Sequence, residues 1–186
     1  NSNALDEVKK SHEFLKVFSK GKLIYGINTG FGPMAQYRID DADLRQLQYN
    51  LVRSHSSGLG KVMSPTQTRA LMLARLNTML LGYSGIHPDT VKLMSTLINS
   101  EAYPCVYSHG GVGASGDLVQ LAHLALGLIG EGEFWFKGQI TPAPDVFKAL
   151  GLEPMQIHIR EGLSILNGTS AMTGIGGINV IMARRL

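Results

Sequence analysis

The chain has 186 residues, a formal net charge of +3 at pH 7, and 44% hydrophobic residues. This length suits one domain with a proper core, and the mild charge, without a basic run or an interleaved aromatic stripe, argues against nucleic-acid binding. The start is not signal-like and no apolar run is long enough to span a bilayer, so no membrane association is expected. The single cysteine, Cys105, excludes an internal disulfide framework and predicts a reducing, cytoplasmic compartment.

Several segments carry apolar residues at the spacing of an amphipathic helix. We expect helices over 5–18, from Asp40 or Asp41 to 58, over 65–82, 88–104, 118–128 and 144–150, and from 171 onward. The expected helix 65–82 begins with the capping box Ser64–Gln67. Pro104 is expected to end the helix that starts at residue 88. Residues 23–25 are expected to be extended, and 134–140 to form a hairpin that turns at 137–138. The pattern predicts a mainly α fold with a small β-hairpin.

Two of these helices carry marks of tight packing. The segment 118–128 is apolar on nearly every side, which predicts deep burial. Its His123 is interpreted as a core histidine, because no second ligand lies at metal-binding spacing beside it, and we expect no metal site. Glycines at 174, 176 and 177 would let the last helix pack closely on a neighbour.

The segment before helix 118–128 is unusual, because four glycines fall within residues 110–116. A tight loop before a core helix is one interpretation. Phosphate binding at the helix N-terminus is another, but neither a Gly-Lys-Ser/Thr ending nor a G-x-G-x-x-G spacing occurs. A third concerns Ala114-Ser115-Gly116: the Gly116 amide nitrogen can bend back toward the Ala114 carbonyl at little steric cost, and Ser115 can lose water to leave an alkene.

The tripeptide 114–116 resembles the active-site loop of the histidine and aromatic amino acid ammonia-lyases. The segments 25–32 (YGINTGFG) and 161–169 (EGLSILNGT) resemble two further motifs of this family, in the same order. The resemblance implies that 1–186 is the N-terminal catalytic portion of a longer enzyme, without an internal boundary, that leads into a long helical bundle missing here. It also implies a homotetramer in which each active site draws residues from three subunits.

The resemblance further implies the chemistry of the site. In the family, the Ala-Ser-Gly segment cyclises and dehydrates autocatalytically to 4-methylidene-imidazol-5-one (MIO), here from Ala114, Ser115 and Gly116. Tyr25 would take the β-hydrogen of the substrate as a general base, and Asn167 would hold the electrophile and the amino acid group of the substrate. Helix N–H groups after Asp117 would stabilise negative charge on the MIO oxygen. Without the family pattern, Tyr25 would be an ordinary loop tyrosine and Asn167 a turn asparagine.

The resemblance implies that the substrate is an aromatic amino acid that loses ammonia without oxidation, but the motifs disagree on which one. Ser54-His55 resembles the pair that faces the substrate ring in histidine lyases, whereas 167–173 resembles the phenylalanine and tyrosine branch. Residues 109–111 and 119–120 also depart from the common family pattern. We favour L-histidine to urocanate, with His55 binding the ring. The alternatives are a tyrosine ammonia-lyase giving p-coumarate, an MIO-dependent aromatic aminomutase, and a catalytically dead helical subunit. The isolated segment is expected to be inactive.

Overall fold

The computed structural model describes residues 2–186, so Asn1 of the expected unit 1–186 lies outside the described residues. Most of the chain is helical, which confirms the mainly α class. The helices are α1 (Ser2–Phe18), α2 (Leu44–His55), α3 (Pro65–Leu80), α4 (Pro88–Asn99), α5 (Leu118–Leu128), α6 (Ala143–Leu150), α7 (Glu161–Leu166) and α8 (Ser170–Ala183), with a 3-10 turn, η1, at Gly32–Met34. The strands are β1 (Leu59–Val62), β2 (Tyr103–Pro104), β3 (Tyr107–His109), β4 (Glu133–Phe136) and β5 (Gln139–Pro142).

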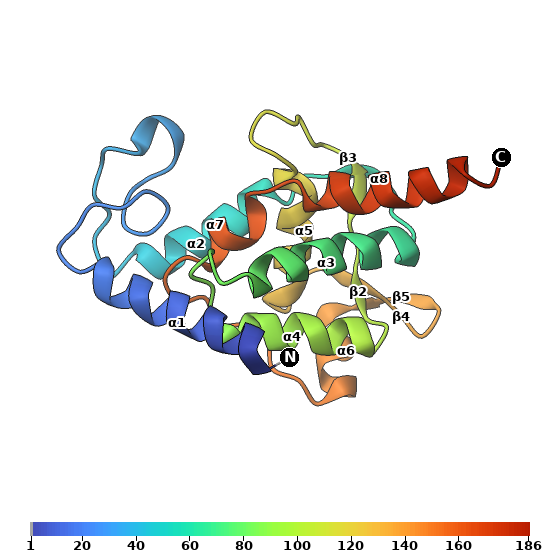
Figure 1. The fold of residues 1–186 in the computed structure, drawn as a ribbon, viewed down its shortest axis with the longest axis horizontal. Coiled ribbons are helices and arrows are strands. Elements are labelled where there is room, and N and C mark those ends of the chain that lie inside the picture. The colour runs from blue at the N-terminus through green and yellow to red at the C-terminus, as the bar shows by residue number, and fades with distance from the viewer. Residues whose placement is uncertain (1) are drawn as a thin grey trace.

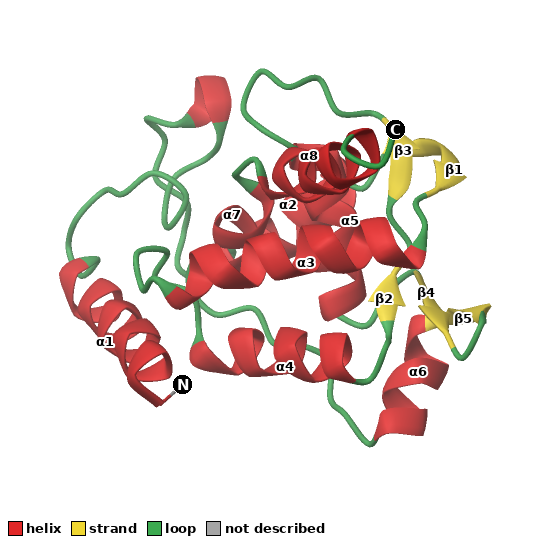
Figure 2. Cartoon of the chain, turned by 45° about the vertical axis from the view of Figure 1, so that its right-hand side comes forward, coloured by secondary structure: helices red, strands yellow, loops and turns green. Residues whose placement is uncertain are grey.

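Helix α3 lies between α8 and α4 and contacts both (Figure 1). Helix α5 packs against α2 and α7, while α1 crosses the ends of α3 and α4. The strands gather at the end of the molecule away from α1 (Figure 2). Within residues 2–186, no helix combines the length and the apolar character needed to cross a bilayer.

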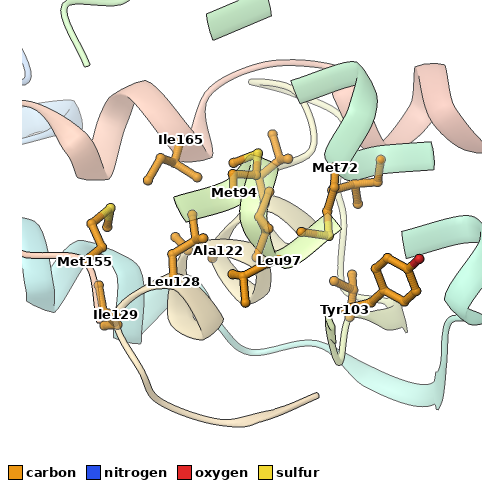
Figure 3. Close-up of a cluster of buried hydrophobic side chains, with 14 of the residues drawn as sticks. Met72, Met94, Leu97, Tyr103, Ala122, Leu128, Ile129, Met155 and Ile165 are labelled. Atoms are coloured by element: carbon orange, nitrogen blue, oxygen red, sulfur yellow. The ribbon is translucent and has the colours of Figure 1, made fainter. Parts of the chain in front are cut away.

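Helix α5 is the most apolar element of the core. Its Leu121, Leu124 and Leu128 are fully buried, which confirms the expected burial. Figure 3 shows Leu128 in the same cluster as Met94 of α4 and Ile165 of α7. Burying a leucine or methionine side chain contributes about 1.5–3 kcal/mol, so this cluster fixes α4, α5 and α7 together.

His123 of α5 is a core histidine, as expected. Its Nε2 accepts a hydrogen bond from the Gly58 amide at 3.0 Å. Burial lowers the pKa of His123, because desolvation disfavours the imidazolium form. The neutral ring therefore anchors the segment that follows α2.

The expected hairpin is present, and it is part of a larger sheet. β4 and β5 pair antiparallel and turn at Lys137 and Gly138, whose φ values of 51° and 81° suit a two-residue hairpin turn. The expectation that Pro104 ends a helix is wrong: α4 ends at Asn99, and Pro104 lies in β2, opposite Phe134 of β4. β2 is an edge strand, where proline's missing N–H removes no ladder bond.

Two further local expectations are wrong. Residues 23–25 do not form an extended strand, because the amide of Ile27 donates back to the carbonyl of Ile24 and the chain turns. Neither Asp40 nor Asp41 caps α2. The amide of Asp43 bonds to the carbonyl of Asp40 in a turn, so the helix starts only at Leu44. The pairing of β1 with β3 was not expected at all.

The glycines of α8 differ in what they face. A Cβ at Gly174 would lie 2.6 Å from the Leu71 amide nitrogen of α3, so only glycine allows this approach. Close packing is therefore confirmed at this position. A Cβ at Gly176 or Gly177 would meet no atom within 4 Å among the described residues, so close packing at these two positions stays a prediction.

We predict that Gly174→Ala destabilises the chain by about 1–3 kcal/mol, because the added methyl group meets backbone atoms of α3 that cannot move aside. Gly176→Ala is the matched control. In the 186-residue chain it should stabilise α8 by about 0.5–1 kcal/mol, since alanine favours the helix and its Cβ meets no atom of residues 2–186. Urea unfolding followed by circular dichroism measures both, and equal midpoints for the two variants would contradict the packing at Gly174.

Candidate active site

The turn that carries Tyr25 is held by a buried asparagine. The side chain of Asn28 accepts a hydrogen bond from the Ile24 amide at 2.7 Å and donates one to the Lys22 carbonyl at 2.6 Å. These two bonds fold residues 22–28 into a compact turn with Tyr25 on its outside, where the side chain is 48% exposed. The family-like segment 25–32 therefore contributes both the tyrosine and the asparagine that shapes its loop.

Gly26 lets this turn approach α7. Its φ is +76°, and a Cβ there would collide with the side chain of Leu163. The carbonyl of Gly26 accepts a hydrogen bond of 3.2 Å from the side chain of Gln48 in α2. The turn is thus fixed between α2 and α7.

Tyr25 and Asn167 line one cleft of about 420 Å³, although they are far apart in the sequence. Its walls are formed by α7, by the C-terminal half of α3 and by the segment that follows α3. The other lining residues are Arg75, Thr78, Met79, Tyr83, Ser84, Arg160, Leu163 and Ser164. The structure therefore brings together two of the residues that the sequence singled out.

The Ala114–Gly116 tripeptide lies in the loop between β3 and α5, the yellow loop at the top of Figure 1. Ala114 and Ser115 are exposed. Gly116 forms an isolated parallel bridge with Gly168, and the amide of Asp117 donates to the Gly168 carbonyl at 2.7 Å. The tripeptide is therefore joined, through its last residue, to the turn that begins with Asn167.

The local backbone fits a cyclised tripeptide. Ring closure would join the Gly116 nitrogen to the Ala114 carbonyl carbon, and it needs both groups free of helix or ladder hydrogen bonds. Within residues 2–186 the Gly116 amide donates to no backbone carbonyl. Its φ of +94° is a conformation that L side chains rarely adopt, and a Cβ would collide with the Gly168 carbonyl oxygen. Residues 114–116 are thus suited to the MIO group.

Sequence reasoning missed Arg75. This arginine of α3 is only 7% exposed and donates to the backbone carbonyls of Ser164 and of Asn167, the latter at 2.8 Å. Burial lowers the pKa of Arg75 to about 10, against the raising effect of Asp117, so the side chain stays charged at neutral pH. The sequence does place Arg75 on the same helix face as Leu71 and Met79, four residues from each. Because a charged residue is rarely buried unless it is paired, an arginine on an apolar face indicates a specific role.

His55 does not line the cleft of Tyr25 and Asn167. It is the last residue of α2, and its Nδ1 lies 2.9 Å from the Leu51 carbonyl oxygen and 3.1 Å from the Ser54 hydroxyl. A carbonyl oxygen can only accept, so Nδ1 carries the hydrogen in this arrangement. In the neutral ring Nε2 is then an acceptor.

The three family-like segments thus lie together in a mainly helical fold, because Tyr25 and Asn167 line one cleft and Gly116 is bridged to Gly168. The sequence profile of the family described as "Aromatic amino acid lyase" matches residues 1–186, and the chain belongs to this family. A histidine ammonia-lyase from Geobacillus thermodenitrificans is 44% identical over 184 residues, which cover 98% of this chain and 36% of that protein.

Solved structures show the same fold. A phenylalanine aminomutase from Pantoea agglomerans superposes with a TM-score of 0.94 at 31% identity, over 100% of this chain and 36% of that one. A histidine ammonia-lyase from Trypanosoma cruzi gives a TM-score of 0.89 at 33% identity, over 99% of this chain and 36% of that one. The chain therefore spans about a third of the length of the relatives it matches.

Proposed function

We propose that residues 1–186 are the N-terminal catalytic portion, without an internal boundary, of an ammonia-lyase that converts L-histidine to urocanate. The observation that carries the proposal is the Gly116–Gly168 bridge, which joins the Ala114–Gly116 loop to Asn167 beside the cleft that Tyr25 lines. The names of curated relatives support histidine as the substrate, since those from Geobacillus thermodenitrificans and Deinococcus radiodurans are both called histidine ammonia-lyase.

The reaction must expel a poor leaving group and remove a feebly acidic β-hydrogen. MIO, formed from Ala114, Ser115 and Gly116, would supply the electrophile that makes the substrate amine a better leaving group. Tyr25 would take the β-proton while the Cα–N bond breaks, a double bond forms between Cα and Cβ, and ammonia departs. Asn167, with two amide donors and one acceptor, would hold the reacting groups in register.

Ring recognition is assigned to His55. The Nε2 acceptor inferred from its Nδ1 contact suits the N–H of a substrate imidazole, and equally the hydroxyl of a substrate phenol. The tyrosine lyase giving p-coumarate therefore remains the alternative substrate assignment. His55 does not line the cleft of Tyr25 and Asn167. If His55 binds the substrate ring, the ring must therefore extend from this cleft toward the C-terminal end of α2.

An aminomutase is the second candidate function. The phenylalanine aminomutase from Pantoea agglomerans has a very similar fold, and tyrosine aminomutase structures reach a TM-score of 0.88 at 36% identity. Such an enzyme would use Tyr25 and the same tripeptide, but would return the ammonia to the β-carbon. Analysis of the products of L-histidine, L-tyrosine and L-phenylalanine separates an arylacrylate from a β-amino acid.

The full-length protein is proposed to be a cytoplasmic homotetramer that acts on a small amino acid, without nucleic acid, membrane or metal. Exposed apolar side chains along the end of α8, Val180, Ile181 and Met182, suit the docking of further helices. Because the groups that bind the substrate carboxylate are expected outside residues 1–186, the isolated segment is proposed to be inactive.

We predict that Ser115→Ala abolishes both the electrophile and nearly all turnover in the full-length protein. Intact mass spectrometry should find wild type lighter than its sequence by two waters, and the variant without this deficit. Ser108→Ala is the control, because Ser108 is exposed in the strand before the loop and takes no part in cyclisation. An active wild-type protein whose mass equals the mass calculated from its sequence would refute the formation of MIO.

We predict that Tyr25→Phe folds and forms the electrophile but turns over about 10²–10⁴-fold more slowly, the typical contribution of a positioned general base. Tyr37→Phe is the matched control, since Tyr37 is a similarly exposed tyrosine on the same long loop. Steady-state kinetics and intact mass measure the two effects separately. Turnover by Tyr25→Phe at the wild-type rate would leave Tyr25 a structural residue.

We predict that His55→Phe shifts substrate preference toward L-phenylalanine. A polar ring atom left without its partner costs about 1–3 kcal/mol, whereas the phenyl ring loses nothing. The ratio of kcat/KM values for histidine, tyrosine and phenylalanine measures the shift. Ser57→Phe, two residues further on, controls for the mere addition of a ring near α2. Unchanged ratios in His55→Phe would remove His55 from ring recognition.

A further inference from the structure

The guanidinium of Arg75 closes the C-terminal end of α7. One of its nitrogens, Nη2, donates to the carbonyls of Ser164 and Asn167, groups that a helix end leaves without intrahelical partners. The other, Nη1, lies so close to Gly168 that a Cβ there would collide with it. A buried charge is tolerated only where it is well bonded, so these contacts define where Arg75 sits.

The same turn is bound from its other side by the tripeptide loop. The Gly168 carbonyl accepts the Asp117 amide at 2.7 Å, and the Asp117 carboxylate accepts the Met172 amide of α8 at 2.9 Å. The Asn167–Gly168 backbone is therefore held between Arg75 and the residue that directly follows Gly116. Moving Arg75 would release the turn and, with it, the support of the tripeptide.

We propose that Arg75 is a positioning residue, which fixes the Asn167–Gly168 turn so that the Asn167 amide and the Ala114–Gly116 loop stay in register. The inference rests on the proposed function, because it assigns Arg75 to the formation and use of the electrophile. Arg75 acts through backbone carbonyls and makes no contact with the reacting atoms.

A direct contact with the substrate carboxylate is the competing role, because Arg75 also lines the cleft. The geometry favours positioning. Nη2 is engaged by two carbonyls, Nη1 faces Gly168, and Nε is buried without a hydrogen-bond partner among the described residues. The two roles differ in kinetics: a carboxylate contact chiefly sets KM, while positioning chiefly sets kcat.

The test uses the full-length protein with Arg75→Met, Arg75→Lys and the control Arg69→Met, which removes an exposed arginine of the same helix. Intact mass reports the two-water deficit, kinetics with L-histidine give kcat and KM, and amide hydrogen exchange follows residues 114–118 and 164–172. We expect Arg75→Met to exchange faster in both segments, to carry a smaller modified fraction and to lose about 10²-fold in kcat. Arg75→Lys should be intermediate and Arg69→Met unchanged.

Wild-type exchange and kcat in Arg75→Met would overturn the proposal, and so would a raised KM with unchanged kcat. If Arg75→Met does not fold, Arg75→Lys decides by the same criteria, since it keeps the charge but lacks both the planar guanidinium and the second nitrogen, Nη1, that lies against Gly168. A wild type without the mass deficit would refute the proposed function instead. In that case the exchange data still decide whether Arg75 holds the turn.

Discussion

The contact between Gly116 and Gly168 is the constraint on which the site depends. The loop before α5 and the turn after α7 meet backbone to backbone at these two glycines. A side chain on Gly116 would collide with the Gly168 carbonyl. Both glycines have positive φ, +94° and +154°. The sequence therefore places glycine at two positions where the approach, and not loop flexibility, requires it. The Ala114–Gly116 tripeptide and Asn167 are neighbours because of this contact.

Helix α3 holds the Gly116–Gly168 contact in place. Arg75 bonds the turn before Gly168, and the backbone of α3 at Leu71 receives Gly174 of α8. One helix thus fixes the chain on both sides of Gly168, once by hydrogen bonds and once by close packing. The apolar cluster beneath, with Met72 and Met94, keeps α3 rigid against α4. This packed scaffold holds the site in place, while Tyr25, the Ala114–Gly116 tripeptide and Asn167 lie in turns and loops.

Periodicity, capping residues and turn glycines predicted most helices and the hairpin, because these signals are local. The pairing of β1 with β3 could not be predicted, since strands of three or four residues carry almost no pattern and their pairing depends on distant chain segments. The motifs identified Tyr25, the tripeptide and Asn167 by resemblance. Arg75 was missed because its role appears only when α3 meets the end of α7, although its charge within an apolar stripe was visible.

The exposure of Tyr25 and of the tripeptide bears on how the proposed reaction would work. Tyr25 is 48% exposed, and Ala114 and Ser115 are also exposed, so within residues 2–186 water reaches both the phenol and the tripeptide. A positioned base and a developing negative charge act more strongly where water is excluded. The relatives are about three times as long as this chain, and the full-length protein proposed above would have further segments to cover these groups. In the proposed enzyme, the fold of residues 2–186 would supply the geometry of the site, and the tetramer would supply its low-dielectric enclosure.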